Sequence, residues 1–411
     1  MSEIWREEYK LLERKLVERG LNVRTIRKAI ASFRCETPSW GYGPSGTRFG
    51  VFPQAGEAKT IHEKLEDAGE CHRLTGVCPA VAVHIPWDKA DDYDDLKKFA
   101  KSQGVQIGAI NPNVFQDHDY KFGSFGHADK AVRKKALEHM KECCQIMKAT
   151  GSDLLSLWFA DGTDYPGQAD FRARKHRFEE DLQATYAMLP KSGRMLIEYK
   201  FFEPAFYHTD IADWGMALSF AQKCGDRAQV LVDLGHHAQG VNIEHIVAFL
   251  IDEKRLGGFH FNNRKYADDD LTCGSTNPYE LFLIFTELTA AEAEKNTLPH
   301  PIAYMIDQCH NTKPKLEAMI QTVEHIQQAQ ARALLVDRKR LREAQANNDV
   351  IGAERCLTEA YGTDVEPLLK SVREEIGAAT SPVEAYRTGG YMEKKIRERA
   401  RTKATAGLGV N

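Results

Sequence analysis

Residues 257–271 read GGFHFNNRKYADDDL and place a histidine and three adjacent carboxylates in one short stretch. His260 lies in an apolar, aromatic run of strand type, and Asp268, Asp269 and Asp270 follow it. Carboxylates this close repel one another and raise one another's pKa values. Alternate side chains of an extended segment point the same way, so we expect Asp268 and Asp270 to face one point and Asp269 to face away. A divalent cation at that point would remove the repulsion.

Charged side chains also end several other apolar runs, where they are costly unless they are paired or bound to a metal. They are Glu198 and Lys200 in IEYK, Asp233 and His236 in DLGHH, and Asp307 in MIDQ. His237 is the alternative to His236 as a ligand, and we prefer His236. Cys309 and His310 are given no ligand role. Several distant runs thus supply ligands of the same kind, which indicates a metal site.

The candidate ligands suffice for two ions. The first set is rich in oxygen and consists of Glu198, Asp233, His260 and Asp307. The second set shares Asp233 and adds His236, Asp268 and Asp270. Carboxylate-dominated sets with one imidazole each favour Mn²⁺, Mg²⁺ or Co²⁺ over a structural zinc, which prefers thiolates. Two ions that share a carboxylate can bind two neighbouring oxygens of one substrate.

These residues need a frame that brings distant strand ends together. Short apolar runs recur with helical stretches between them, as parallel strands covered on both faces do. They span residues 81–87, 105–111, 154–162, 195–201, 230–236, 257–262 and 302–308, with a weaker candidate at 36–43. The alternation predicts an α/β fold, a (β/α)₈ TIM barrel over residues 35–333, whose chemistry gathers at the carboxyl ends of the strands. A doubly wound open sheet is the alternative, but no G-x-G-x-x-G motif follows the first strand.

Helical segments flank the predicted barrel. Residues 1–34 form an N-terminal helical segment, and residues 334–411 are rich in charge and contain no further strand. This C-terminal helical extension is either a solvated tail or an arm that packs on the barrel or on a neighbouring subunit. We expect an oligomerisation arm.

The composition disfavours several classes of partner. The chain has 55 Lys and Arg against 59 Asp and Glu, a net charge of −4, so we expect neither a nucleic-acid nor a membrane partner. Residues 1–16 are charged throughout and have no apolar core of a signal peptide. Nine cysteines occur without a C-x-x-C pair, which is typical of reduced thiols. We therefore expect a cytoplasmic protein.

Motifs from distant parts of the chain together resemble one family. PSWGYGPSGTRFG, VHIPWDKAD, LVDLGHH, GGFHFNNRKYADDD and MIDQCHN occur in the order and at the spacings of the broad-specificity L-rhamnose isomerases, which are relatives of xylose isomerase. The resemblance implies a cytoplasmic, homotetrameric aldose–ketose isomerase with two Mn²⁺ ions per subunit and a small sugar as substrate. It implies conversion of L-rhamnose, and of other aldoses, by a hydride shift, while proton transfer through an enediol stays open.

The same resemblance implies roles for individual residues. The first ligand set would hold a structural ion and the second a catalytic one. Lys200, Asp307 and His84 are the candidate catalytic residues: Lys200 would lie beside the sugar's O1 and His84 near its ring or O5 end. Trp40 and Trp158 would line the pocket. The loop that carries Phe49 would cap the active site of a neighbouring subunit.

Other functions are possible for such a barrel. A sugar epimerase of the same superfamily uses a single ion, so the second ligand set and Lys200 argue against it. A metal-dependent phosphodiesterase would need a basic rim for phosphate, which a net charge of −4 does not favour. A sugar-sensing barrel without activity is disfavoured because no expected ligand is missing.

Overall fold

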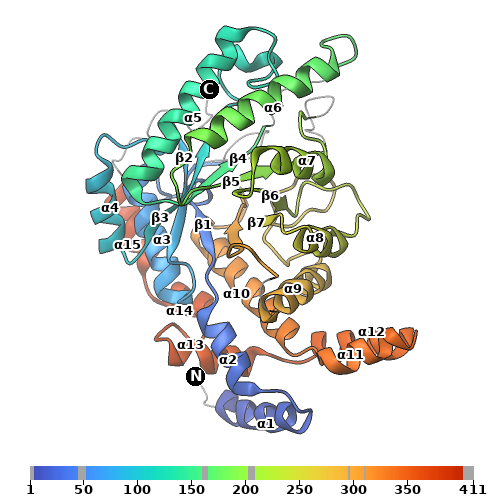
Figure 1. Ribbon diagram of the computed structural model, residues 1–411. Coiled ribbons are helices and arrows are strands. Elements are labelled where there is room, and N and C mark those ends of the chain that lie inside the picture. The colour runs from blue at the N-terminus through green and yellow to red at the C-terminus, as the bar shows by residue number, and fades with distance from the viewer. Residues whose placement is uncertain are drawn as a thin grey trace.

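The computed structural model of the chain describes residues 4–44, 52–159, 165–201, 209–294, 297–309 and 312–400. Its centre is a closed barrel of parallel strands that follow one another in sequence order (Figure 1). The strands are β1 (Glu36–Pro38), β2 (Ala80–Ile85), β3 (Gln106–Pro112), β4 (Leu154–Leu157), β5 (Arg194–Glu198), β6 (Ala228–Asp233), β7 (Leu256–Phe261) and β8 (Ala303–Ile306). The barrel closes where Glu36 of β1 pairs with Met305 of β8. The predicted TIM barrel is confirmed, and the open-sheet alternative is wrong.

Helices cover the outside of the barrel and connect its strands (Figure 1). They are α3 (Ile61–Thr75), α4 (Tyr93–Ser102), α5 (Lys130–Thr150), α6 (Phe171–Met188), α7 (Trp214–Cys224), α8 (Ile243–Asp252), α9 (Pro278–Ala293) and α10 (Lys315–Leu334). Short 3-10 helices, η1 (Ser39–Gly41) and η2 (His118–Phe122), lie in the loops after β1 and β3. Most of the barrel helices begin at an Asp or Asn whose side chain accepts a hydrogen bond from the first turn, which stabilises the helix start.

Apolar side chains fill the barrel interior. A small cluster inside the strands consists of Trp40, Ala82, Ala109, Leu154, Leu196, Leu231, Ala303 and Met305. A much larger cluster lies between the strands and the surrounding helices. The barrel is therefore a packed core rather than a pore, and polar chemistry is confined to its ends.

Several strands end earlier than the apolar runs of the sequence. β4 stops at Leu157, β5 at Glu198, β6 at Asp233 and β8 at Ile306, each two to five residues before the end of its predicted run. The remaining residues of those runs belong to loops at the carboxyl ends of the strands. The candidate site residues beyond the strands therefore take their positions from loops.

The helices outside the barrel belong to the two ends of the chain. They are α1 (Ile4–Glu18), α2 (Val23–Ser32), α11 (Arg338–Ala346), α12 (Val350–Tyr361), α13 (Glu366–Glu375), α14 (Pro382–Thr388) and α15 (Tyr391–Arg399). In Figure 1, α13 lies beside α1 and α2, and Arg6 pairs with Glu374 at 2.7 Å. The described extension thus packs in part on its own chain, and its role as an oligomerisation arm stays a prediction. No helix of the described residues has the length and apolar composition needed to span a bilayer.

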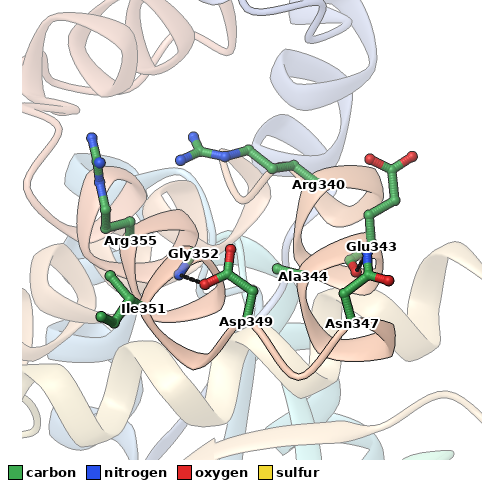
Figure 2. A pocket seen from close by; sticks show the side chains of 8 residues that line it. All are labelled: Arg340, Glu343, Ala344, Asn347, Asp349, Ile351, Gly352 and Arg355. Carbon is green, nitrogen blue, oxygen red and sulfur yellow. Dashed lines mark hydrogen bonds between the residues drawn. The ribbon is translucent and has the colours of Figure 1, made fainter.

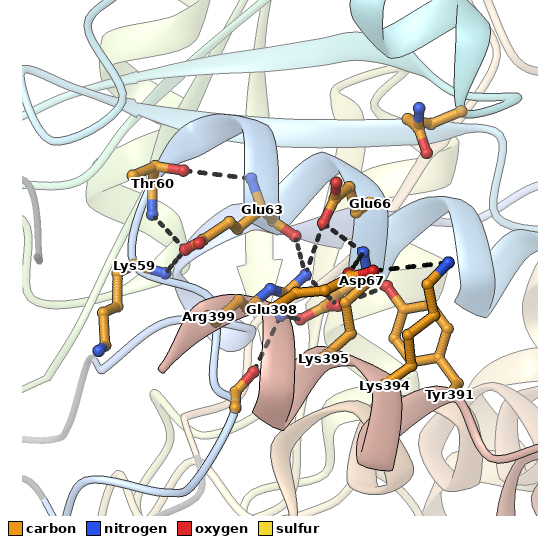
Figure 3. A network of polar contacts seen from close by, with 12 residues as sticks. Lys59, Thr60, Glu63, Glu66, Asp67, Tyr391, Lys394, Lys395, Glu398 and Arg399 are labelled. Atoms are coloured by element: carbon orange, nitrogen blue, oxygen red, sulfur yellow. Dashed lines mark hydrogen bonds and ion pairs between the residues drawn. The ribbon is translucent and has the colours of Figure 1, made fainter. Parts of the chain in front are cut away.

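A polar network attaches α15 to the barrel helix α3 (Figure 3). Arg399 donates through Nη1 and Nη2 to both carboxylate oxygens of Asp67, at 2.9 and 2.8 Å, and both side chains are buried. Tyr391 donates to Asp67 Oδ1 at 2.7 Å, and Lys395 pairs with Glu66 at 2.8 Å. Because a buried charge is tolerated only with a partner, α3 and α15 depend on each other.

A surface hollow lies between α11 and α12, away from the barrel strands. Figure 2 shows its lining of mixed charge, which consists of Arg340, Glu343, Ala344, Asn347, Asp349, Ile351, Gly352 and Arg355. Arg340 is already paired with Glu359 at 2.7 Å, and Asp349 accepts from the backbone N–H of Gly352. The hollow contains none of the candidate site residues.

A bulge in β3 is stabilised by a buried carboxylate. The register between Val81 and Val83 of β2 shifts against β3, so that Gly108 and Ala109 together face one residue of β2. Glu36 reaches across from β1, and its two oxygens accept the Ala109 N–H at 3.0 and 3.1 Å. Burial raises the pKa of Glu36 to about 7, although the Ala109 N–H opposes the shift. Gly108 leaves the space that the carboxylate fills.

We predict that Gly108→Ala destabilises the barrel through Glu36. A Cβ atom at position 108 would lie 1.7 Å from a Glu36 carboxylate oxygen, so the carboxylate would have to leave Ala109. We expect the free energy of unfolding to fall by about 1–3 kcal/mol, measured by urea denaturation. In a Glu36→Ala background the same substitution should cost less, because its steric partner is gone. Equal costs in the two backgrounds would contradict this account.

Candidate metal centre

Acidic and imidazole side chains meet at the carboxyl ends of three neighbouring strands. Glu198 ends β5, Asp233 ends β6 and His260 lies one residue before the end of β7. The register pairs Asp233 directly with His260. All three side chains are buried, and Asp307 enters the cluster from the loop after β8.

The first predicted ligand set is brought together around one imidazole nitrogen. His260 Nδ1 lies 3.3 Å from Glu198 Oε2, 3.7 Å from Asp233 Oδ2 and 3.6 Å from Asp307 Oδ2. Asp233, His260 and Asp307 each offer one atom within 4.8 Å of the other two. Oxygen-rich groups of this size suit a hard or borderline divalent cation.

Part of the second predicted set surrounds His236. Its Nε2 lies 3.3 Å from Asp268 Oδ2 and 3.9 Å from Asp233 Oδ1. Its Nδ1 lies 3.0 Å from the Tyr199 carbonyl and 3.1 Å from Glu198 Oε1. The carbonyl favours a proton on Nδ1, which leaves Nε2 as the atom that could bind a metal. Asp233 thus lies between the two groups, and its role as a shared ligand stays a prediction.

The three consecutive aspartates take different environments. Asp268 is buried and accepts from Lys200 Nζ at 2.7 Å. Asp269 caps its own loop, because its Oδ2 accepts the backbone N–H of Tyr266 at 2.7 Å. Asp270 is half-buried and has a left-handed backbone with φ 47°, which is uncommon for a residue other than glycine. Among the described residues two groups have ligand atoms within 4.8 Å of one another, Glu198–Asp233–His236 and Asp233–His260–Asp307. Asp270 belongs to neither, so its ligand role stays a prediction.

Mutual electrostatics govern this cluster. Burial raises the pKa of Asp233; His236 counteracts the shift, Glu198 adds to it, and the value reaches about 7. Burial alone would lower the pKa of His260, but attraction to Glu198 and Asp307 raises it to about 9. Burial would also lower the pKa of His236, but attraction to Asp233 outweighs this effect and holds the pKa well above its usual value. For Glu198, burial is outweighed by His260 and His236, and the pKa falls to about 2. Without a cation, protons on the imidazoles balance the carboxylates.

Hydrogen bonds from outside the ligand set orient the carboxylates. Asn262 Nδ2 donates to Asp233 Oδ1 at 2.9 Å, and the Gly235 N–H donates to the same oxygen at 2.7 Å. Trp40 Nε1 donates to Asp307 Oδ1 at 2.7 Å, so this tryptophan lies against the cluster. Outer partners of this kind fix ligand orientation in metal sites. Strand alternation places Asn262 on the same side as His260. The sequence therefore contained a signal for Asn262, although Asn262 was not predicted as a site residue.

Aromatic rings form a continuous path beside the cluster. Trp40 contacts His84 edge to face at 5.7 Å, and His84 contacts Phe115 in the same way at 5.7 Å. Phe115 packs on Trp158 at 4.7 Å, and Trp158 lies parallel to His236 at 6.2 Å. Phe115 lies in the loop after β3, and its contribution was not predicted from the sequence because an aromatic residue in a loop carries no periodic signal. The path gives one side of the site flat apolar surfaces of the kind that pack on a sugar.

Polar atoms within this path are available for a ligand. Burial lowers the pKa of His84 to about 3, so its imidazole is neutral. Among the described residues, His84 Nδ1 and Trp158 Nε1 are buried without a hydrogen-bond partner. Lys200 Nζ lies over the Trp158 ring at 5.1 Å while it donates to Asp268. Phe49, the remaining predicted pocket residue, lies outside the described residues.

A buried ion pair fixes His84 relative to the loop that carries Trp40. Lys64 Nζ lies 2.6 Å from Asp88 Oδ1, and both side chains are fully buried. The other oxygen of Asp88 accepts from Ser39 Oγ and from the His84 N–H, the latter at 2.8 Å. The pair therefore joins α3, η1 and the end of β2. Its partners lie far apart in the sequence, so no local pattern predicted it.

Comparison with known proteins places the chain in a family. The chain matches the family described as "Xylose isomerase-like TIM barrel" over residues 64–283, and it belongs to that family. It is 45% identical over 397 residues to a "probable sugar isomerase" of Rhizobium meliloti (strain 1021), covering 95% of this chain and 92% of that protein. A second "probable sugar isomerase", from Mesorhizobium japonicum, is 46% identical over the same shares of both chains. A solved structure of an L-ribulose 3-epimerase has a TM-score of 0.50 and 16% identity, covers 80% of this chain and 97% of its own, and is similar in fold alone.

We predict that metal binding releases protons. An imidazole must lose a proton before it can coordinate a metal, and the raised pKa of His260, about 9, keeps it protonated at pH 7 in the metal-free state. Titration of Mn²⁺ into metal-free protein at pH 7 should release roughly one to two protons in total. Calorimetry in buffers of different ionisation enthalpy measures this number. His260→Gln should lower it, and a heat independent of the buffer would contradict the prediction.

Proposed function

We propose that the protein is an aldose–ketose isomerase that uses two divalent cations, Mn²⁺ in the first instance, with L-rhamnose as its substrate and other aldoses accepted. The observation that carries the proposal is the convergence of Glu198, Asp233 and Asp307 on His260 Nδ1 within 3.3–3.7 Å. The names of the two relatives at 45% and 46% identity support a sugar isomerase. The motifs of the sequence support the rhamnose assignment.

In this proposal the two ligand sets divide the work. Glu198, Asp233, His260 and Asp307 hold one cation, while His236, Asp268 and Asp270 hold the other with Asp233 shared. Bound cations supply Lewis acidity at neighbouring oxygens of the open-chain sugar. Trp40 and Asn262 keep the carboxylates in one orientation through their hydrogen bonds.

The isomerisation itself moves a hydrogen from C2 to C1 and a proton from O2 to O1, with no net redox change. Lys200 stabilises the negative charge that develops at O1, because Asp268 holds its ammonium at 2.7 Å in a buried position. We propose that the hydrogen moves as a hydride. Asp307 is the candidate base of the enediol route, since burial raises its pKa, while Trp40 Nε1 fixes the orientation of the carboxylate through Oδ1.

The aromatic path binds the remainder of the sugar in this proposal. Trp158 and Trp40 pack against its carbons, and neutral His84 hydrogen-bonds to a hydroxyl near the ring or O5 end. Phe49 caps the site of a neighbouring subunit in a homotetramer. We place the enzyme in the cytoplasm, without nucleic-acid or membrane partners.

The proposal predicts activity that depends on one particular aspartate. Metal-stripped protein should regain aldose isomerisation with Mn²⁺, assayed on L-rhamnose, L-mannose, L-lyxose and D-allose with Co²⁺ and Mg²⁺ in parallel. Asp268→Asn should lower kcat by at least about 100-fold, because it removes a charge beside His236 and Lys200. Asp269→Asn is the matched control: it removes a charge from the same loop but keeps an oxygen for the Tyr266 N–H, so kcat should change little. Equal losses of kcat in the two variants would contradict the role assigned to Asp268. If the protein instead epimerised ketoses at C3 and formed no aldose, the epimerase alternative would be favoured.

Isotope transfer separates the two chemical routes. A hydride shift carries deuterium from C2 of a labelled aldose to C1 of the ketose without exchange. We therefore expect the label to stay in the product, measured by NMR or mass spectrometry after partial conversion in water. Loss of the label to solvent at a rate close to turnover would establish the enediol route, for which Asp307 is the candidate base.

A further inference from the structure

A buried arginine of α6 joins two loops at the carboxyl end of the barrel. Arg174 lies in the first turn of α6, the helix that follows β4. Its Nε and Nη2 donate to the two carboxylate oxygens of Asp210, in the loop after β5, the latter at 2.7 Å. Its Nη1 donates to the Phe122 carbonyl, in the loop after β3, at 2.7 Å. Both charged side chains are at least nine-tenths buried.

The loop after β3 is shaped to receive this guanidinium. Gly123 has φ 99°, and a Cβ atom there would lie 2.2 Å from Arg174 Nη2. A Cβ atom at Gly126 would lie 2.5 Å from Arg174 Cζ. Two glycines thus open a slot around the planar group, and its bidentate bond with Asp210 fixes its angle in that slot.

Asp210 lies between two residues that bind the backbone of Lys200. The Lys200 N–H donates to the Ile211 carbonyl at 2.9 Å. The Thr209 hydroxyl donates to the Lys200 carbonyl. Both polar groups of the Lys200 main chain are therefore held by the neighbours of Asp210, while the side chain extends to Asp268. Lys200 has left β5, which ends at Glu198, so the barrel ladder does not hold it.

We propose that Arg174 and Asp210 form a positioning pair that holds Lys200 in its reactive place. The pair anchors segment 209–211 to α6 and to the loop after β3, and that segment in turn fixes the Lys200 backbone. The inference rests on the proposed function, because it takes Lys200 as the residue that stabilises charge on the sugar. Displacements of about 1 Å at such a group cost up to roughly 100-fold in rate.

The test compares Asp210→Asn and Arg174→Lys with Arg177→Lys. Arg177 lies on the same helix and donates to the Gly126 carbonyl, so its replacement disturbs the same loop without removing the pair. We expect Asp210→Asn to lower kcat for aldose isomerisation by about 10- to 100-fold, with KM and Mn²⁺ affinity changed less than about threefold. Arg174→Lys keeps the charge but loses the bidentate bond, so it should lie between wild type and Asp210→Asn. Arg177→Lys should match wild type.

Hydrogen exchange measures the position of Lys200 without reference to activity. Asp210→Asn and Arg174→Lys should speed exchange of the Lys200 amide, resolved on peptides that include residues 195–201, and should increase acylation of Lys200 Nζ. Amides of β8 should exchange as in wild type. Unchanged exchange at Lys200 would overturn the proposal, as would faster exchange with an unchanged kcat per folded molecule.

Failure of the proposed function gives a different result. If wild type converts no aldose, or if Lys200→Met keeps full activity, the role of Lys200 is wrong. The exchange and acylation data on Asp210→Asn then still decide whether the pair positions Lys200. Arg174→Lys serves the same purpose if Asp210→Asn does not fold, because it leaves no charge buried alone.

Discussion

Repulsion among buried carboxylates is the constraint on which this protein depends. Glu198, Asp233 and Asp307 surround His260 Nδ1 at 3.3–3.7 Å, and of these carboxylates only Asp307 is partly exposed to water. Carboxylates in such a position are tolerable only beside positive charge. Protonated imidazoles provide this positive charge in the metal-free chain. The neighbouring carboxylates accordingly raise the pKa values of His236 and His260. A cation bound at this cluster would meet the same demand and would replace those protons.

Strand ends, loops and buried ion pairs each position a different part of the cluster. Glu198, Asp233 and His260 come from strand ends, whereas Asp307, Lys200 and Asp268 come from loops, and Lys200 pairs with Asp268 at 2.7 Å. Two buried ion pairs farther out tie loops to helices: Lys64 with Asp88 fixes the loop after β2, and Arg174 with Asp210 fixes the loop after β5. Each such pair is net neutral, so it can sit near the cluster without adding to its charge. Strand ends thus hold part of the candidate ligand set, and neutral pairs hold loops that carry or border the other candidate site residues.

The sequence allowed the barrel and the proximity of the first set of candidate ligands to be predicted, because both follow from local patterns. Apolar runs mark buried parallel strands, and a charged residue such as Asp233 at the end of a run marks a ligand. Tertiary contacts, rather than local patterns, decide where the strands end and how Asn262, Phe115 and the pair of Lys64 with Asp88 are placed. The sequence therefore did not predict these features. Asn262 is an example. Its alternation with His260 can be read from the sequence, but its hydrogen bond from Nδ2 to Asp233 Oδ1, at 2.9 Å, is seen only in the structure. The role of Asp270 depends on loop geometry, which no spacing rule supplies.

The link between α15 and α3 has a consequence for how the chain acquires its shape. Asp67 lies in the first helix that follows a barrel strand, and its charged partner Arg399 follows every strand of the barrel in the chain. During synthesis the ribosome therefore makes the aspartate more than three hundred residues before the arginine that neutralises it. Docking of α15 on α3 therefore waits for synthesis of the last described helix, although all eight strands of the barrel precede it in the chain.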